Sequence, residues 1–115
     1  DIAVIDEGAY RILGRASIDI IKSGGFKLSA LEIEATLLEH PNVSEVAVIG
    51  VPDHEWGELV ACALVVHEQV SQESLIKWAR ERMSAYKVPR KWHFTDALPR
   101  NALGKVTKPS LRSWF

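Results

Sequence analysis

The sequence predicts an α+β domain with a mixed central sheet flanked by helices, preceded by a separate two-stranded hairpin at the N-terminus. Two valine-rich runs, residues 43–51 and 59–67, are typical of neighbouring strands in a buried sheet. Two further segments have helix entries marked by serines at positions 29 and 71. With 115 residues, 47% of them hydrophobic, the chain is long enough to bury one core.

The first part of the chain is predicted to form two successive hairpins. Residues 2–5 and 10–13 are short runs with the composition of strands. Residues 18–22 and 26–28 form a tighter pair around Ser23-Gly24-Gly25, because glycine allows the backbone to turn at positive φ.

Two helices follow from their capping residues. Ser29 and Glu32 have the spacing of a capping box, and we expect this helix to run to about Glu39, where His40-Pro41 stops it. The second helix has Ser71 as its cap. We expect it to carry Arg80 and Arg82 in its last turn and to bury the apolar face Leu75, Trp78, Ala79 and Met83.

The C-terminal third is predicted to add an edge strand and a short helix. Residues 92–94 have the composition of a strand. Residues 99–108 are predicted to form a loop, and residues 110–115 the short helix. The two valine-rich strands before them should be joined by the polar loop "PDHEWGE".

The charge and cysteine content exclude several classes of function. The net charge of -1 and pI near 6.5 give no global attraction to nucleic acid or to a membrane surface. The sequence contains no run of about 18 apolar residues, so no membrane-spanning helix is predicted. The single Cys62 is expected to be a core residue, and it fits a reducing compartment. The four histidines have no metal-binding spacing, so no metal site is expected.

Three loops contain residues that could bind anions, although each also has an ordinary structural interpretation. In "KSGGFK", Lys22 and Lys27 flank a double glycine that a phosphate could approach, or that is simply a hairpin turn. In "GRASID", Arg15 offers a planar fork of donors, or lies exposed at a strand end. In "PRNALGK", Lys105 follows Gly104 and could reach an anion outside the domain, or belong to a solvated basic tail together with Lys108.

These stretches together, as "GRASIDIIKSGGFKLSALEIE", "GVPDHEWGE" and "PRNALGK", resemble the C-terminal domain of the acyl-adenylate-forming enzymes. This superfamily includes acyl-CoA synthetases, the adenylation domains of peptide synthetases and firefly luciferase. The resemblance covers essentially the whole chain. Within the superfamily, "DIIKSGGFKLSALEIE" and "LPRNALGK" are most similar to malonyl-CoA and methylmalonyl-CoA synthetases.

The resemblance implies an ATP-dependent carboxylic acid:CoA ligase that forms an acyl-adenylate and then a thioester. Residues 1–14 would be the end of a linker with its hairpin, and residues 15–115 a mobile domain that alternates between two poses. A large N-terminal domain, absent here, would hold Mg²⁺, most of the ATP and the acid, so the fragment alone is expected to be inactive. The resemblance also implies an intracellular location, in the mitochondrial matrix or the cytoplasm.

The resemblance also assigns roles to single residues. Lys105 matches the catalytic lysine that reaches the α-phosphate and the attacking carboxylate. Asp1 matches the aspartate that binds the ribose hydroxyls, and Arg15 the arginine that contacts the nucleotide. The hinge falls on Ser17, where the family has Asp or Lys, with Ile18 as the alternative because this chain is one residue longer before the glycines.

For the second half-reaction, the resemblance points to the turn around the double glycine. Gly24, Gly25 and Lys27 match the loop that lines the pantetheine tunnel of CoA. Lys22 matches a position near the active site in the same pose.

Two other functions fit the same loops. The chain could belong to an adenylation domain that loads a carrier protein, or it could be a stand-alone module that binds an anionic partner. The mass of the native protein distinguishes a stand-alone module from a ligase, because a mass near that of this chain would exclude the ligase.

Overall fold

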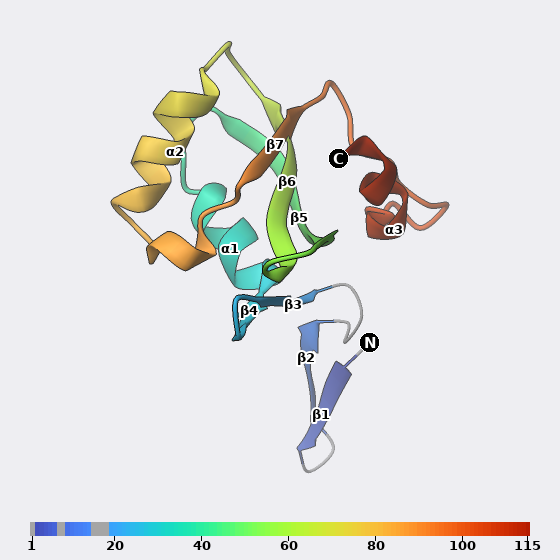
Figure 1. Ribbon diagram of the computed structural model, residues 1–115. Coiled ribbons are helices and arrows are strands. Elements are labelled where there is room, and N and C mark those ends of the chain that lie inside the picture. Colours follow the sequence, from blue (N-terminus) through green and yellow to red (C-terminus); the bar gives the residue numbers. More distant parts are fainter. Residues whose placement is uncertain (1, 7–8, 15–18) are drawn as a thin grey trace.

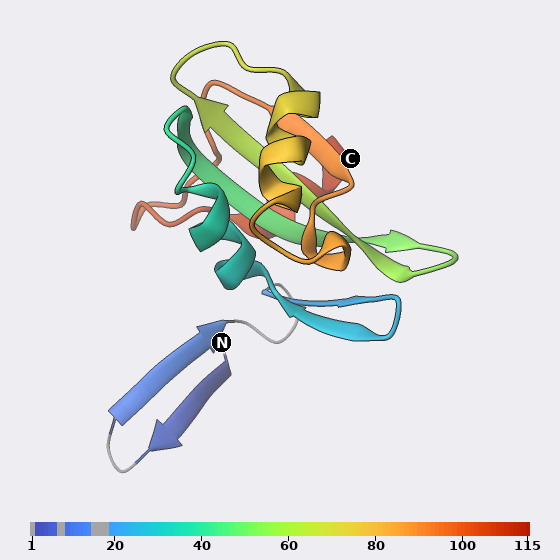
Figure 2. The same ribbon diagram turned by 90° about the vertical axis from the view of Figure 1, so that its left-hand side faces the viewer.

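The computed structural model describes the main chain of residues 2–6 and 9–14 and all atoms of residues 19–115. Strands β1 (Ile2–Asp6) and β2 (Ala9–Gly14) pair antiparallel in a two-stranded sheet of their own. Figures 1 and 2 show this hairpin projecting away from the rest of the chain. The predicted N-terminal hairpin is therefore confirmed.

The second sheet has five strands: β3 (Ile20–Ser23), β4 (Phe26–Ser29), β5 (Val43–Asp53), β6 (Gly57–Val66) and β7 (Lys91–Phe94). Their order is β4-β3-β6-β5, and β7 pairs with β6. The β6–β7 pair is parallel whereas the other pairs are antiparallel, so the predicted mixed sheet is confirmed.

The long β5–β6 ladder forms the centre of the fold, and both of its faces are buried. Helices α1 (Ala30–Leu37) and α2 (Gln72–Arg80) cover one face, and α3 (Lys108–Leu111) lies on the other (Figure 1). Side chains alternate between the two faces along each strand. The first face buries residues such as Val48, Val60, Cys62 and Leu64, and the second buries Ala47, Ile49, Ala61, Leu98 and Leu111.

The two serine caps are present as predicted. The hydroxyl of Ser29 accepts the N–H of Glu32 at 3.3 Å, and that of Ser71 accepts the N–H of Ser74 at 3.1 Å. Each cap satisfies a backbone donor that the helix itself leaves unpaired.

The helix ends differ from expectation by a residue or two. Helix α1 stops at Leu37 and does not reach Glu39. Helix α2 stops at Arg80, so Arg82 lies beyond it, where its guanidinium donates to the carbonyl of Trp78 and lies over that indole ring. Differences of one or two residues are usual at helix ends, because the last turn frays.

The C-terminal helix begins earlier than predicted. Instead of residues 110–115, α3 covers Lys108–Leu111 and a 3₁₀ turn covers Arg112–Trp114. Pro109 lies in the first turn of α3, where its missing N–H costs nothing and its fixed φ favours the helix. A second 3₁₀ turn, Ala85–Lys87, precedes β7.

Lys108 is a largely buried ion-pairing residue, which corrects its expected place in a solvated tail. Its side chain is only 12% exposed, and its Nζ lies 2.7 Å from Oε2 of Glu34 and pairs with the carboxylate of Asp19. The same Glu34 oxygen accepts the N–H of Val48 at 2.8 Å. These partners are 74 and 89 residues from Lys108 in the sequence, so no local pattern could show them.

Burial changes the titration of two groups in this core. It raises the pKa of Glu34, an effect that the Lys108 ammonium and the Val48 N–H oppose. It also raises the pKa of the Cys62 thiol well above the ordinary value, because that side chain has no exposed surface. The thiol stays protonated at neutral pH, which agrees with the predicted role of Cys62 as a core residue.

Lys108→Met should destabilise the chain by about 3–5 kcal/mol, because it leaves two buried carboxylates without their cation. The free energy of unfolding, measured by urea denaturation at neutral pH, tests this expectation. Lys77→Met, at an exposed position of α2, is the matched control and should change that energy by under about 0.5 kcal/mol. Equal effects of the two substitutions would contradict a structural role for the ion cluster.

Candidate functional site

Lys105 lies at the end of a short, tightly turned hairpin. The N–H of Gly104 donates to the carbonyl of Asn101 at 2.9 Å, and the N–H of Asn101 donates to the carbonyl of Lys105 at 2.9 Å. Gly104 has a φ of 80° with open space around its Cα, so this position requires glycine for its backbone conformation and not for room. We call residues 99–107 the lysine hairpin.

Side chains fix the lysine hairpin to the sheet. The guanidinium of Arg100 donates to the carbonyl of Gly104 at 2.8 Å and pairs with the carboxylate of Glu45 on β5. At its base, the N–H of Thr107 donates to the carbonyl of Pro99 at 2.9 Å. The loop predicted from the sequence is therefore ordered by bonds on both sides of the lysine.

The side chain of Lys105 itself is exposed. Within residues 19–115, no carboxylate pairs with its ammonium. Its neighbour Leu103 is 81% exposed at the tip of the same hairpin. A fixed backbone thus presents a cation and an apolar side chain at the surface.

The turn between β3 and β4 carries the double glycine, with φ of 57° at Gly24 and 88° at Gly25. Gly24 packs against Trp56: its N–H donates to the Trp56 carbonyl at 2.9 Å, and a Cβ would lie 2.6 Å from Cε3 of the indole. A Cβ on Gly25 would meet nothing within 4 Å. The two glycines therefore differ, because the space at Gly24 is already filled by Trp56 and the space at Gly25 is open.

Lys22 and Lys27 face each other across this hairpin. They are directly opposite in the β3–β4 register, so both side chains project from the same face, and both are exposed. The N–H of Lys22 donates to the carboxylate of Glu58 at 2.9 Å, which holds the hairpin to the start of β6.

Aromatic residues surround the double-glycine turn. The guanidinium carbon of Arg90 lies 4.5 Å from the centre of the Trp56 ring, and the rings of Phe26 and Tyr86 stack at 4.1 Å. The three aromatic side chains are 37–47% exposed. Arg90 and Tyr86 are not predictable from local patterns, because these contacts join segments that are distant in the sequence; the local signal at this site is an aromatic residue within the polar run "PDHEWGE".

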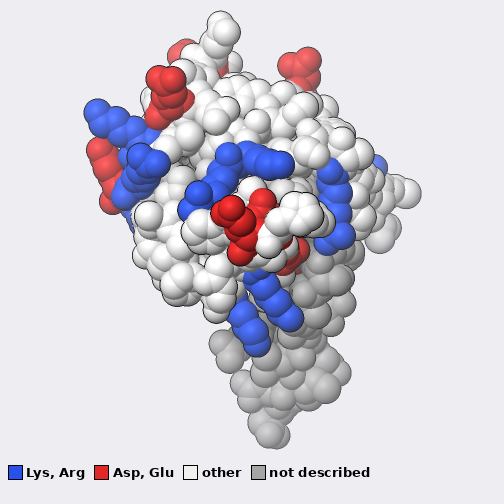
Figure 3. Space-filling view, viewed as in Figure 1, with Lys and Arg blue, Asp and Glu red and all other residues white. Residues whose placement is uncertain are grey.

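The lysine hairpin and the double-glycine turn lie in different parts of the molecule. In Figure 1 the lysine hairpin lies beside α3, and the turn between β3 and β4 lies beyond the lower end of β6. Figure 3 shows Lys and Arg in separate groups among acidic residues on this face, and not as one basic surface. Asp1, Arg15 and Ser17, the other predicted site residues, lie outside the described residues.

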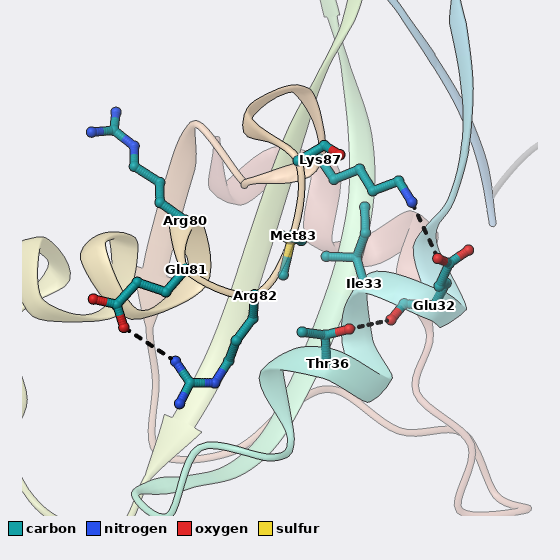
Figure 4. Close-up of a pocket in the computed structure, with 9 residues that line it drawn as sticks. Glu32, Ile33, Thr36, Arg80, Glu81, Arg82, Met83 and Lys87 are labelled. Carbon is teal, nitrogen blue, oxygen red and sulfur yellow. Dashed lines mark hydrogen bonds and ion pairs between the residues drawn. The ribbon is translucent and has the colours of Figure 1, made fainter.

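A groove between α1 and the end of α2 also contains charged residues (Figure 4). Its charges are paired with each other: Lys87 Nζ lies 3.2 Å from the carboxylate of Glu32, and Arg82 lies 3.5 Å from that of Glu81. Arg80 points away from the other side chains in this view. The groove therefore presents no group of unpaired cations to a ligand.

The chain is similar in sequence to CoA ligases. The family model for the AMP-binding enzyme C-terminal domain matches residues 32–105. The human mitochondrial malonate–CoA ligase ACSF3 is 45% identical over 117 residues, which cover all of this chain and 20% of that protein. The probable CoA ligase CCL8 of Humulus lupulus is 46% identical over 95% of this chain and 20% of its own length. The chain thus spans about a fifth of the length of the curated relatives it matches.

The fold is also similar to solved structures. ATP-bound MatB from Rhodopseudomonas palustris superposes with a TM-score of 0.87 at 36% identity, over 97% of this chain and 23% of that one. A fatty acyl CoA synthetase of Mycobacterium tuberculosis gives 0.83 at 40% identity, over 98% and 23%. In the described part of this chain, no helix has the length and apolar character needed to cross a membrane.

The contrast between the two glycines is testable by stability measurements. Each Gly→Ala substitution places a side chain at positive φ and should cost about 1–3 kcal/mol. Gly24→Ala should cost about 1–3 kcal/mol more than Gly25→Ala, because its Cβ collides with Trp56. The free energy of unfolding by urea gives both values.

Trp56→Ala provides the control in a double-mutant cycle. It should remove the additional cost of Gly24→Ala and leave the cost of Gly25→Ala unchanged. Additive effects of Trp56→Ala and Gly24→Ala would rule out the steric explanation.

Proposed function

The chain belongs to the AMP-binding enzyme C-terminal domain family, and from this membership we propose that it serves an ATP-dependent carboxylic acid:CoA ligase. The ligase would form an acyl-adenylate and then an acyl-CoA thioester. The observation that carries the proposal is the exposed ammonium of Lys105, which has no ion-pair partner among residues 19–115. It belongs to a hairpin whose backbone is fixed by hydrogen bonds from Arg100 and to Asn101. A residue presented in this way acts on a ligand held outside its own domain.

Lys105 suits the first half-reaction. A carboxylate oxygen of the acid attacks the α-phosphorus of ATP, the bond from that phosphorus to the bridging oxygen breaks, and pyrophosphate leaves. Both reactants are anionic, so an ammonium between them offsets their repulsion and the negative charge that grows on the phosphoryl oxygens. Within residues 19–115, Lys105 has no ion pair to break before it takes this position.

The double-glycine turn suits the second half-reaction. The CoA thiol releases its proton to water, the thiolate sulfur attacks the carbonyl carbon of the adenylate, the bond from that carbon to the phosphate oxygen breaks, and AMP leaves. The open side of Gly25 lets a thin pantetheine arm pass along the backbone. Lys27 and Lys22 on the adjacent face, and Arg90 over Trp56, supply cations and an aromatic surface beside the same turn.

The separation of the two loops supports a domain that alternates between two poses. The two loops lie in different parts of the described fold (Figure 1), so in this proposal each half-reaction uses its own face. In this proposal residues 1–14 end the linker, residues 15–115 rotate about a hinge at Ser17, and Asp1 and Arg15 contact the nucleotide. Mg²⁺ accompanies ATP on the large N-terminal domain, and this fragment alone is inactive.

We propose malonate or methylmalonate as the acid. The proposal is supported by the malonate–CoA ligases among the relatives and by the likeness to MatB. We propose the mitochondrial matrix or the cytoplasm as the location; the human ACSF3 relative is a mitochondrial protein by name.

Lys105→Ala in the full-length protein should lower the rate of ATP–pyrophosphate exchange by about 10²-fold to 10³-fold, as removal of one preorganised donor does. The same variant should form thioester from preformed acyl-adenylate at the normal rate. Gly25→Trp should slow thioester formation from preformed acyl-adenylate and leave the rate of ATP–pyrophosphate exchange unchanged. The reason is that the indole blocks the open side of the turn and does not affect Lys105.

Lys77→Ala, at an exposed lysine of α2, is the control and should leave both rates unchanged. Equal losses in both half-reactions for Lys105→Ala would contradict the assignment of one face to each half.

The acid is identified by pyrophosphate release from the full-length protein over malonate, methylmalonate, acetate and longer-chain acids, with free CoA present. Malonate or methylmalonate should give the highest kcat/KM and a soluble CoA thioester. A preference for acetate or a long-chain acid would overturn the substrate proposal, and adenylate formation without transfer to free CoA would indicate a carrier-loading adenylation domain.

A further inference from the structure

We propose that Asn101 is a positioning residue for the first half-reaction, because its side chain fixes the direction in which Lys105 leaves the lysine hairpin. Its Oδ1 accepts the N–H of Leu103 at 2.9 Å and the N–H of Lys105 at 3.1 Å. One amide oxygen thus holds the backbone on both sides of Gly104. This inference rests on the proposed role of Lys105.

The backbone of Asn101 adds two further hydrogen bonds to the same segment. Its carbonyl accepts the N–H of Gly104, and its N–H donates to the carbonyl of Lys105, each at 2.9 Å. Asn101 therefore bonds to three successive residues, Leu103, Gly104 and Lys105. The two backbone bonds survive any side-chain substitution, so the amide oxygen is the part that a variant can remove.

The need for this oxygen follows from Gly104. A glycine at φ 80° with open space around it has no side chain to restrict its backbone, and Lys105 is the next residue. The lysine adds a flexible four-carbon stem of its own. Without the bond from Oδ1, the N–H of Lys105 would turn to water and the ammonium would sample a wider volume.

Asn101 can be tested separately from the stability of the fold. It is exposed, and the N–H groups that it satisfies lie in an exposed loop, so water can replace its oxygen at little cost in free energy of unfolding. The rate of phosphoryl chemistry is more sensitive, because a misplacement of about 1 Å in a catalytic group can cost about 10²-fold.

Serine and alanine form a matched pair at this position. Asn101→Ser keeps a neutral oxygen that can accept hydrogen bonds from backbone N–H groups at the first position of a turn, whereas Asn101→Ala removes it. Neither substitution changes the charge around Lys105. The comparison therefore isolates the accepting oxygen.

The experiment uses the full-length protein with malonate, ATP and CoA. Asn101→Ala should lower the kcat of ATP–pyrophosphate exchange by about 10-fold to 10²-fold, with the KM for ATP changed less than threefold. Its rate of thioester formation from preformed acyl-adenylate and its thermal unfolding midpoint should equal those of the wild type. Asn101→Ser should recover most of the exchange rate.

Three results would overturn the inference: an unchanged exchange rate in Asn101→Ala, equal losses in both half-reactions, or a serine variant as slow as the alanine variant. Lys105→Ala, measured in parallel, separates this inference from the proposed function. If Lys105→Ala retains exchange, both fail. If Lys105→Ala loses exchange and Asn101→Ala does not, only the positioning role of Asn101 fails.

Discussion

The buried ion cluster of Lys108, Asp19 and Glu34 connects the parts of the fold on which both candidate loops depend. Asp19 immediately precedes β3, which leads to the double-glycine turn, and Lys108 begins α3 immediately after the lysine hairpin. Glu34 belongs to α1, which covers the central sheet between them. One ammonium therefore joins the bases of two loops that lie far apart in the sequence. Such a cluster is costly to bury, and removing one partner from it costs more than the pair contributes.

The lysine hairpin and the double-glycine turn are attached to the same part of the fold. Because the two loops are tied to one sheet and one ion cluster, the rotation proposed above would move the lysine hairpin and the double-glycine turn together as one body. Around the two loops the exposed surface combines charged side chains with large apolar ones, among them Phe26, Trp56, Tyr86 and Leu103, of which Leu103 is the most exposed. Interfaces between domains of one chain are more polar than those of obligate complexes.

Features governed by neighbouring residues could be predicted from the sequence. The serine caps, the hairpin at the double glycine and the valine-rich strands each depend on residues a few positions apart, and all are present. Lys108 and the Trp56–Arg90 contact could not be predicted, because each joins segments that meet only in the folded chain.

The candidate site divides in the same way. Local motifs predict Lys105 and the two glycines as candidate residues. The filling of the space at Gly24 by Trp56 could not be predicted, because that contact joins two distant segments. The hydrogen bonds of Asn101 have a local signal in the sequence, because asparagine at the first position of a turn with glycine at the fourth is a common turn pattern.

The bond between Glu34 and Val48 has a consequence for association between copies of the chain. Among the strands that the structure describes, β5 ends the sheet and pairs only with β6, so its outer edge carries backbone groups that could pair with a strand of another molecule. The Glu34 carboxylate occupies the N–H of Val48 on that edge, and Lys108 fixes the carboxylate in place. A helix that covers a sheet edge and occupies one of its backbone donors discourages edge-to-edge pairing there, so the same contact that joins α1 to β5 also makes this part of the edge unavailable to another strand.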